Sequence, residues 1–289
     1  MFQNARTKLF QAFANVYPTR RLQSSPLLRG VWRAALATLR PAHVELRLEH
    51  YRIRLPATTR FYGRSLLYRG GIEPAMSRAV LESIEPGATV VDVGANVGHY
   101  TLLAAARAGV VHAFEPDPAC TAILRDNLSL QSIDNVVVHA AAVADRDGRA
   151  DFFIDDDNAG GHSLVEATTV ISSTSHDVPV VRLDTQFAGA TVDVLKIDAQ
   201  GVELQVVRGA RDILARAPVA VFVEFWPHGM ALCGDDPGDL LSEFTALGYH
   251  PHRVFAGKRE IEDVTNHVRS VAAQAENPHA AADILFRRG

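Results

Sequence analysis

Two carboxylates stand where apolar segments of the chain end. Asp92 lies within VVDVGANVG at 90–98, and Glu115 directly follows the apolar run at 110–114. If both runs are neighbouring strands, the two side chains meet at one edge of a sheet, where open α/β proteins bind ligands. A carboxylate there accepts hydrogen bonds from ribose hydroxyls and attracts a cation. The pair predicts a site for a nucleoside that carries positive charge.

The residues around Asp92 indicate which nucleoside is bound. Gly94 lets the backbone turn sharply beside a ligand, and Gly98 lets the next helix start close to the sheet. A dinucleotide site requires G-x-G-x-x-G, but Asn96 stands where its second glycine would be. Asp92 would also repel a phosphate, whereas S-adenosyl-L-methionine carries an ammonium, a sulfonium and no phosphate. We therefore predict S-adenosyl-L-methionine as the cofactor. A nicotinamide-dependent oxidoreductase and a non-catalytic nucleoside-binding protein are the alternatives.

The third strand end is predicted to contact the adenine. Ala142 and Val143 occupy it, and Asp145 just beyond them is either a further contact or a turn residue. The predicted cofactor-binding residues are Asp92, Gly94, Asn96, Gly98, Glu115, Pro116, Ala142, Val143 and Asp198.

Four segments stand in order along the chain: DVGANVGHYT at 92–101, FEPDP at 114–118, LKIDAQGVELQVVRGA at 195–210 and VEF at 223–225. Through these four segments the chain resembles the FkbM-type methyltransferases over roughly residues 70–287. The third is the distinctive one, because the first two occur across many S-adenosylmethionine enzymes. The resemblance implies an α/β fold of class I methyltransferase (Rossmann-like) type, with a seven-stranded, mostly parallel sheet, helices on both faces and an antiparallel last strand.

The same resemblance implies O-methylation of a hydroxyl on a sugar, glycolipid or related natural product. A polyketide or another small-molecule hydroxyl is the alternative acceptor. Many family members have Glu where this chain has Gln200, so one candidate carboxylate base is missing here.

Methyl transfer to a hydroxyl needs accurate positioning and a group that removes the hydroxyl proton. Asp198 ends the predicted fourth strand and is the first candidate for that base, with substrate or cofactor orientation as its alternative role. Lys196 lies two residues earlier and is predicted to pair with Asp198 and tune its charge. Glu224 and His228 follow the fifth strand and are predicted to flank the acceptor.

Other polar residues have weaker claims. Glu203 opens a predicted helix, where it either interacts with the helix dipole or contacts substrate. His99 begins the first helix of the nucleoside site and is interpreted as a packed or surface residue rather than a catalyst. The acidic run at 155–157 cannot turn three consecutive side chains toward one ion, so no required metal is predicted.

An alternation of strands and helices must position these groups. Strands that are apolar on both faces and alternate with helices indicate a parallel sheet covered on both sides. The strands are predicted at 88–93, 110–114, 136–142, 192–197, 219–225, 249–255 and 282–287, and the helices at 73–84, 98–108, 117–130, 202–216 and 238–247.

Two regions fall outside this alternation. Residues 44–55 alternate apolar and polar types and predict a strand pair or one long strand. Residues 143–190 contain strand-like runs at 152–154 and 178–183 around a long polar stretch. This stretch either covers the substrate or is an irregular surface loop.

Composition restricts the class of protein and its partners. The 289 residues are 47% hydrophobic and 21% charged, which predicts a packed core, and the net charge of -4 disfavours nucleic-acid binding by the whole chain. Residues 1–44 contain seven basic and no acidic residues, so the rest, with 22 basic and 33 acidic residues, has a net charge of -11. Two cysteines and the lack of a long apolar run favour a cytoplasmic protein.

The domain prediction follows from this charge distribution. Residues 1–43 are predicted to form a basic amphipathic helical arm, which either packs on the catalytic domain or docks on the inner face of an anionic membrane. Residues 44–289 are predicted to form the methyltransferase domain. The oligomeric state does not follow from the sequence.

Overall fold

The computed structural model describes residues 38, 41–56, 73–155, 163–165, 172–217, 219–255 and 263–289. The chain divides into two compact units, Met1–Ile72 and Glu73–Gly289. Most of the predicted arm at 1–43 lies outside the described residues, so its form and its membrane contact stay predictions. Within the described ranges, no helix is long and apolar enough to cross a membrane.

The first unit contains an antiparallel strand pair. β1 (His43–Arg47) pairs with β2 (Arg52–Pro56), and Leu46 lies opposite Ile53. Ile53 and Leu55 are buried while Arg54 between them is exposed, as the period of two in a strand requires. The predicted strand pair over 44–55 is confirmed, and a single long strand is excluded.

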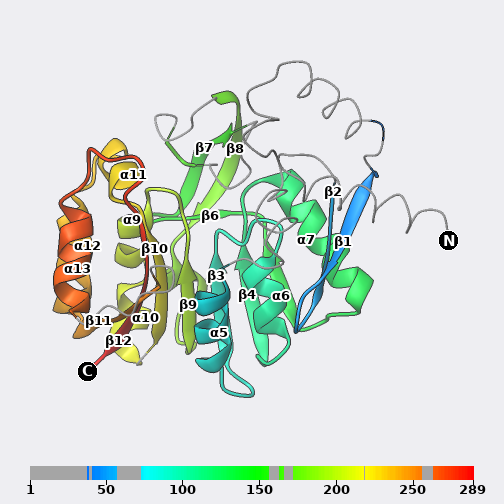
Figure 1. Ribbon diagram of the computed structural model, residues 1–289, viewed down its shortest axis with the longest axis horizontal. Helices are drawn as coiled ribbons and strands as arrows, with labels where there is room; N and C mark the ends of the chain where they lie inside the picture. The colour runs from blue at the N-terminus through cyan, green and yellow to red at the C-terminus, as the bar shows by residue number, and fades with distance from the viewer. Residues whose placement is uncertain are drawn as a thin grey trace, which may run out of the picture. The chain divides into compact units, whose positions relative to one another are not determined.

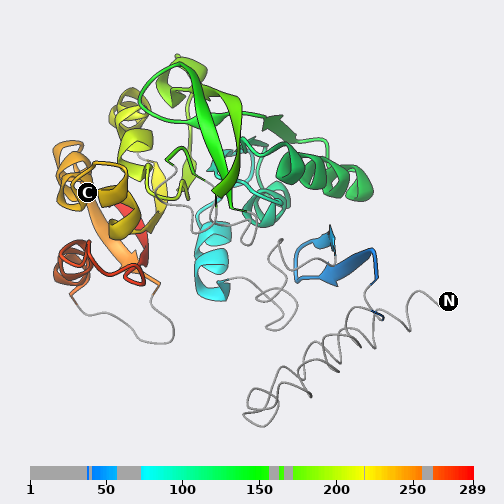
Figure 2. The same cartoon turned by 90° about the horizontal axis from the view of Figure 1, so that it is seen from above.

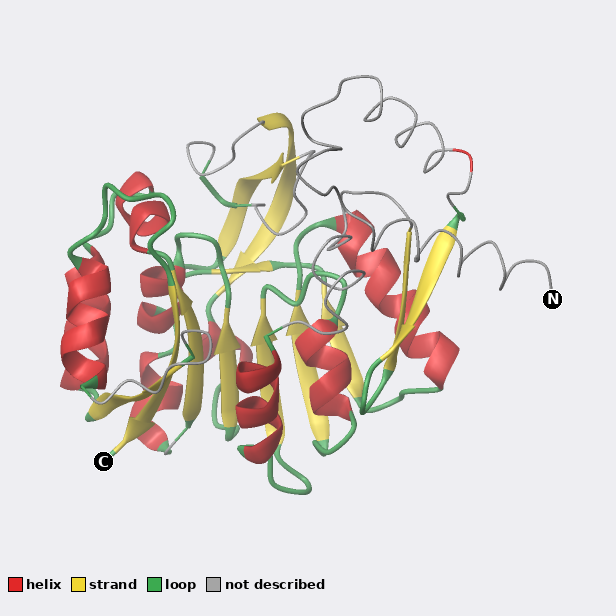
Figure 3. Ribbon diagram, in the orientation of Figure 1, coloured by secondary structure: helices red, strands yellow, loops and turns green. Residues whose placement is uncertain are grey.

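A seven-stranded sheet forms the centre of the second unit (Figures 1 and 3). The strand order is β11-β12-β10-β9-β3-β4-β5, and β12 runs antiparallel to both of its neighbours. This arrangement confirms the predicted mostly parallel sheet with an antiparallel last strand. The bounds are β3 Thr89–Val93, β4 Val110–Phe114, β5 Val136–His139, β9 Val194–Ile197, β10 Ala220–Phe225, β11 Tyr249–Val254 and β12 Ala282–Arg288.

A smaller sheet stands beyond the carboxyl ends of the main strands (Figure 1). It comprises β6 (Ala142–Val143), β8 (Ser172–Val181) and β7 (Gly148–Asp155), in that order. The predicted third strand at 136–142 is therefore too long. It ends at His139, and Ala142 pairs instead with β8 of the small sheet. The strand-like run predicted at 152–154 belongs to β7, and the run at 178–183 extends two residues beyond β8, because β8 ends at Val181 and α8 begins at Leu183.

Helices cover both faces of the main sheet, as Figures 1 and 2 show for α5 and α6 on one side and α9 and α10 on the other. Apolar side chains of β3, β9 and β10 pack on α9 and α10 in one core cluster. The helices are α5 Pro74–Glu82, α6 His99–Ala105, α7 Pro118–Gln131, α8 Leu183–Gln186, α9 Glu203–Arg208, α10 Arg211–Arg216, α11 Pro227–Leu232, α12 Pro237–Ala246 and α13 Val264–Ala272.

Gly209 divides the helix predicted over 202–216, so the prediction of one continuous helix is wrong. A Cβ atom on Gly209 would lie 2.2 Å from the carbonyl oxygen of Ala144, because the chain passes directly over the backbone after β6 at this point. Asp184 then accepts two backbone N–H groups in the first turn of α10, which caps the new helix. A tertiary contact has overridden the helical periodicity.

Candidate active site

A pocket opens at the carboxyl ends of β3, β4 and β9, where the small sheet meets the main sheet. It encloses about 550 Å³, its open mouth included, which suits a small-molecule ligand. Its lining residues are Val93, Gly94, Asn96, Phe114, Glu115, Pro116, Ala141, Ala142, Val143, Phe152, Leu164, Asp198, Ala199, Gln200 and Val202.

The turn after β3 is fixed by backbone contacts at Gly94. The N–H groups of Gly94 and Ala95 both donate to the carbonyl oxygen of Phe114 at 3.0 Å. Gly94 has φ +74°, and a Cβ there would lie 1.8 Å from the carbonyl oxygen of Asp198. The glycine therefore permits a left-handed turn and also a direct approach of the β9 backbone.

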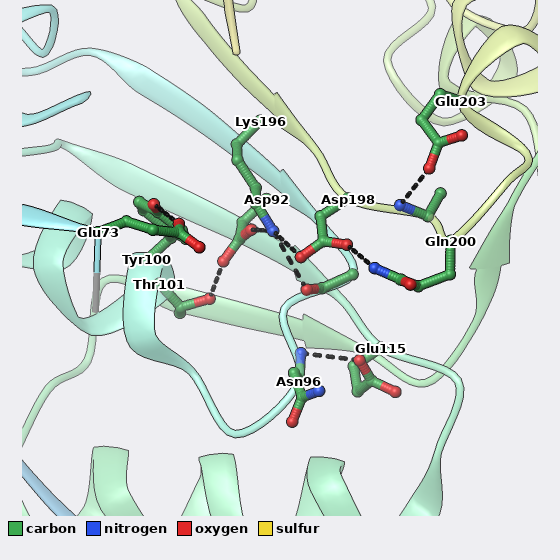
Figure 4. A network of polar contacts seen from close by, with 12 residues as sticks. Glu73, Asp92, Asn96, Tyr100, Thr101, Glu115, Lys196, Asp198, Gln200 and Glu203 are labelled. Atoms are coloured by element: carbon green, nitrogen blue, oxygen red, sulfur yellow. Dashed lines mark hydrogen bonds and ion pairs between the residues drawn. The ribbon is translucent and has the colours of Figure 1, made fainter. Parts of the chain in front are cut away.

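Asn96 occupies a left-handed position at φ 51° in the same turn. Its side-chain oxygen accepts the N–H of Val97 at 2.8 Å, which is how asparagine supports this backbone conformation. Its own N–H donates to Glu115 Oε2 at 2.7 Å (Figure 4). The residue that replaces the second glycine of a dinucleotide motif thus joins the turn to the second predicted carboxylate.

Glu115 faces the pocket at the end of β4. Its Oε1 accepts the N–H of Asp117 at 2.8 Å, so both carboxylate oxygens have a backbone donor. Burial nevertheless raises the pKa of Glu115 to about 8, against the opposing effect of these donors. A carboxyl so placed can still accept hydrogen bonds from ligand hydroxyls through its remaining lone pairs.

Lys196 is a buried cation between two carboxylates on the face of the sheet toward α6 (Figure 4). Its Nζ lies 3.1 Å from Asp198 Oδ2 and 3.7 Å from Asp92 Oδ1, and it is also 5.1 Å from the centre of the Tyr100 ring. Burial favours the neutral amine, but Asp198, Asp92 and Glu224 outweigh burial and raise the pKa of Lys196. Lys196 is therefore charged in the folded protein.

Asp198 receives hydrogen bonds from three side chains. Lys196 donates to Oδ2, Gln200 Nε2 donates to Oδ1 at 2.7 Å, and the Glu224 carboxyl also bonds to Asp198. Burial opposes ionisation, but together these donors hold the pKa of Asp198 below its usual value. The charge of Asp198 and burial raise the pKa of Glu224 well above normal, so the pair holds one proton, on Glu224.

Glu203 fastens the loop that follows β9. Its carboxylate accepts the N–H of Gly201 at 2.9 Å and, at 3.3 Å, the N–H of Ala199. The side chain is fully buried and turned back onto its own loop. Glu203 lies in the first turn of α9, as predicted, and the structure adds that its carboxylate sets the path of residues 198–201.

Comparison with known proteins decides the family. A model of the methyltransferase FkbM domain matches residues 92–251, more than half of the chain. The chain belongs to the FkbM methyltransferase family. As an FkbM methyltransferase it uses S-adenosylmethionine, and the predicted cofactor class and fold are confirmed.

Individual relatives are more distant. Methyltransferase 1 of Beauveria bassiana (strain ARSEF 2860) is 25% identical over 145 residues, which are 43% of this chain and 58% of that protein. Among solved structures, M. jannaschii TYW2 in complex with AdoMet has a TM-score of 0.46 and 12% identity, and covers 86% of this chain and 88% of its own. Wild-type Trm5b from Pyrococcus abyssi has a TM-score of 0.41 and 14% identity, and the match covers 85% of this chain and 56% of Trm5b.

The FkbM fold brings most of the predicted cofactor residues to one pocket. Asp92 and Gly98 are the exceptions. Asp92 points toward α6, where Oδ2 accepts the Thr101 hydroxyl at 2.6 Å, and its Oδ1 lies 3.7 Å from Lys196 Nζ and not in the pocket wall. Gly98 begins α6, and a Cβ there would lie 2.4 Å from a methyl carbon of Leu124, so its role is close helix packing.

Three of the four predicted catalytic residues lie together, and the fourth does not. Asp198, Lys196 and Glu224 form one connected group. His228 does not join it, because its Nδ1 donates to the carbonyl oxygen of Ala275 at 2.8 Å and its ring lies beside Trp226. α11 begins at Pro227, so His228 belongs to the first turn of a helix and not to the end of a strand.

Among the pocket-lining residues that the sequence did not assign to the site, Phe152, Leu164 and Gln200 bear most directly on its shape and chemistry. Phe152 of β7 and Leu164 extend the pocket wall from the small sheet, and the Gln200 amide holds Asp198. The only signal for Leu164 is an apolar pair, Leu164-Val165, within a long polar stretch. From the sequence, Gln200 was interpreted only as the loss of a carboxylate and not as a hydrogen-bond donor to Asp198. Asp145 does not line the pocket, and pairs with Arg146 at 3.8 Å.

Burial of Glu203 predicts that stability falls as pH rises. Its pKa is raised to about 7 from a usual value of 4.5, so the folded state holds a proton that the unfolded chain releases. The protonated form is fully present at pH 4.5, and its contribution is lost progressively as pH rises through 7. The loss amounts to about 3 kcal/mol by linkage.

Urea unfolding of wild type and Glu203→Gln from pH 5 to 8.5 measures this effect. The amide resembles the protonated carboxyl, so the two proteins should be similar at pH 5 and Glu203→Gln should be the more stable at pH 8.5. Burial also raises the pKa of Asp283 to about 7 and that of Glu115 to about 8. These two groups therefore lower the unfolding free energy with rising pH, and they do so equally in both proteins. A constant difference between the two proteins at all pH values would refute the assignment.

Proposed function

We propose that this protein is an O-methyltransferase that acts on a hydroxyl of a sugar, glycolipid or related natural product. The observation that carries the proposal is Asp198, a carboxyl group in the pocket wall after β9 whose two oxygens accept hydrogen bonds from Lys196 and Gln200. A hydroxyl nucleophile loses its proton as the methyl group is transferred, and a carboxylate at this place can accept it. Asp198 also contacts the Gly94 turn through the backbone, so base and donor site are held together.

The pocket suits the parts of the proposed methyl donor. Glu115 would accept hydrogen bonds from the ribose hydroxyls at the end of β4. Ala142, Val143 and Phe152 would cover the adenine with apolar surface. The methionine end would then lie along the Gly94 turn, which directs the sulfonium toward Asp198.

The surroundings of Asp198 favour a neutral, hydroxyl-rich acceptor. Glu224 lies beside Asp198, and Asp283 is the register partner of Glu224 on β12. Tyr100 Oη donates to Glu73 Oε2 at 2.6 Å (Figure 4), and Glu73 interacts electrostatically with both Glu224 and Asp283. Carboxyl and phenol groups exchange hydrogen bonds with sugar hydroxyls, and the cation in this group, Lys196, is already paired with Asp198 and Asp92 rather than available to a phosphate.

An acceptor screen with radiolabelled S-adenosylmethionine tests the function. The panel contains glycans, glycolipids, polyketides and, as a contrasting class, tRNA. We expect the labelled methyl group to appear in a glycan or glycolipid as a methyl ether. A methyl ether resists alkaline hydrolysis, whereas a methyl ester is hydrolysed. Calorimetry on the same preparation should show S-adenosylhomocysteine binding and no NAD binding.

A matched variant separates the proposed base from surface charge. Asp145→Asn removes an acidic residue that lies just after β6 but outside the pocket, and should leave transfer unchanged. Label that enters only the tRNA, or only a nitrogen or carbon atom of any acceptor, would exclude the O-methyltransferase proposal.

A further inference from the structure

Gln200 connects the base to the rest of the pocket wall. Its side-chain amide donates to Asp198 Oδ1 at 2.7 Å, and its backbone carbonyl accepts the Ser163 hydroxyl at 3.0 Å. The residue has φ 50°, a left-handed conformation that is costly for glutamine. Because a carboxylate only accepts hydrogen bonds, the amide nitrogen must face Asp198. Gln200 thus fixes one oxygen of Asp198 while Lys196 holds the other.

Ser163 is built to hold Gln200. It has no exposed surface, and its backbone exchanges hydrogen bonds with Phe153 at 2.8 and 3.1 Å. The hydroxyl donates to Gln200 and accepts the N–H of Val165 at 3.2 Å, so its donor and one lone pair are both used. Its neighbours on both sides of this pairing, Phe152 and Leu164, line the pocket. Ser163 therefore connects the small sheet to the loop after β9 by hydrogen bonds to both.

We propose that Gln200 and Ser163 are positioning residues: Gln200 keeps Asp198 ionised and aimed into the pocket, and Ser163 transmits the position of the small sheet to Gln200. The catalytic meaning rests on the proposed function of Asp198 as the base. The contacts from Ser163 to Gln200 and from Gln200 to Asp198 do not depend on that function, because they are present without any acceptor. Ordering of the small sheet over a cofactor would then also order the base.

The charges around Asp198 determine what Gln200 adds. Lys196 is the cation that faces it, and the acidic groups that interact with it come from five elements. They are Asp92 on β3, Glu115 after β4, Glu203 on α9, Glu224 on β10 and Asp283 on β12. Among so many acidic groups, a neutral amide donor stabilises the ionised carboxylate of Asp198 without adding another titratable group. A carboxyl at position 200 would place two acids at hydrogen-bond distance, and such a pair retains a proton.

Carbon-13 NMR of protein labelled at the aspartate carboxyl carbons tests the role of Gln200. The Asp198 signal is assigned by its loss in Asp198→Asn, with no acceptor or cofactor added. In wild type we expect no titration of this signal between pH 5 and 9. In Gln200→Glu a titration step should appear in that range, because Asp198 then shares a proton with Glu at 200. Gln200→Met, which removes the donor without adding a charge, should move the midpoint in the same direction but less.

Ser163→Ala tests the second link. Loss of the hydroxyl leaves the Gln200 carbonyl and the Val165 N–H without this partner, and S-adenosylhomocysteine affinity should fall about tenfold. The Asp198 midpoint should rise in the same variant. Ser163→Thr retains the hydroxyl and should restore both values. Ser175→Ala, an exposed serine opposite Phe153 on β8, is the matched control and should match wild type.

Two outcomes overturn the proposal. One is an Asp198 signal that titrates identically in wild type, Gln200→Glu and Gln200→Met. The other is a Ser163→Ala protein that binds more weakly while Asp198 titrates as in wild type, since a purely structural serine would produce that result. Neither readout involves methyl transfer, so a wrong acceptor or a different base would leave these outcomes interpretable.

Discussion

Replacing Gly94 by Ala is expected to abolish S-adenosylhomocysteine binding and to cost about 3–5 kcal/mol of unfolding free energy. The added Cβ would lie 1.8 Å from the carbonyl oxygen of Asp198, the residue that directly follows β9. Neither strand can yield easily, because the Asp198 N–H donates to the Val93 carbonyl oxygen at 3.1 Å. Relief of the clash must therefore separate the ends of β3 and β9, which form the pocket wall.

Gly189→Ala is the control for backbone conformation alone. Gly189 has φ +79°, nearly the same as Gly94 at +74°, but a Cβ there would meet nothing within 4 Å. Its replacement should cost only about 1–2 kcal/mol and leave cofactor affinity unchanged. Urea unfolding and calorimetric titration of both variants measure the difference. Equal destabilisation by the two substitutions would show that the strand contact at Gly94 has no energetic importance.

Asp198→Asn should lower kcat by about 10²–10⁴-fold while S-adenosylhomocysteine affinity changes little. The amide keeps the shape of the carboxylate, and its oxygen can still accept from Gln200 or Glu224, but it cannot take a proton from a hydroxyl. Lys196 retains Asp92 as a partner, so the fold should persist. Labelled methyl transfer to the acceptor found in the screen, together with calorimetry, separates chemistry from binding.

The pH dependence and a control on the same strand sharpen this prediction. Because the pKa of Asp198 is held below its usual value, wild-type kcat should lack an acidic limb attributable to this residue above pH 5. Asp193→Asn removes an exposed carboxylate beside the opposite end of β9, where it accepts the Thr89 N–H, and should leave kcat unchanged. A fully active Asp198→Asn protein would remove Asp198 from the list of bases.

The segment at 195–210 shows how a short motif acquires several separate tasks. Lys196 supplies buried positive charge, Asp198 faces the pocket, Gln200 holds Asp198, and Glu203 fixes the intervening loop. The sequence indicated the importance of the segment, but the loop contacts of Glu203 and the hydrogen bond from Gln200 to Asp198 were not predicted. Local spacing shows which residues are near each other along the chain, whereas their partners depend on where the loop turns back.

The predicted cofactor residues also divide into those whose role follows from local sequence and those whose partners depend on the fold. Gly94, Asn96 and Glu115 were predictable because their functions follow from local rules for turns, left-handed residues and strand ends. Asp92 was assigned to the cofactor because it stands in the same motif. Its side chain alternates to the face of the sheet covered by α6, and its nearest cation is Lys196, its register partner on the adjacent strand.

The sequence alone therefore determined the α/β architecture, the family and the turn that builds the nucleoside site. Apolar periodicity, glycine positions and strand-end acids are local properties, and they act through short-range geometry. Only the tertiary structure decided which carboxylates are paired, that Phe152 and Leu164 extend the pocket wall, and that Ser163 reaches Gln200 across 37 positions of the chain. These depend on packing between distant segments, because the charge of a buried acid is set by the neighbours that the fold brings to it.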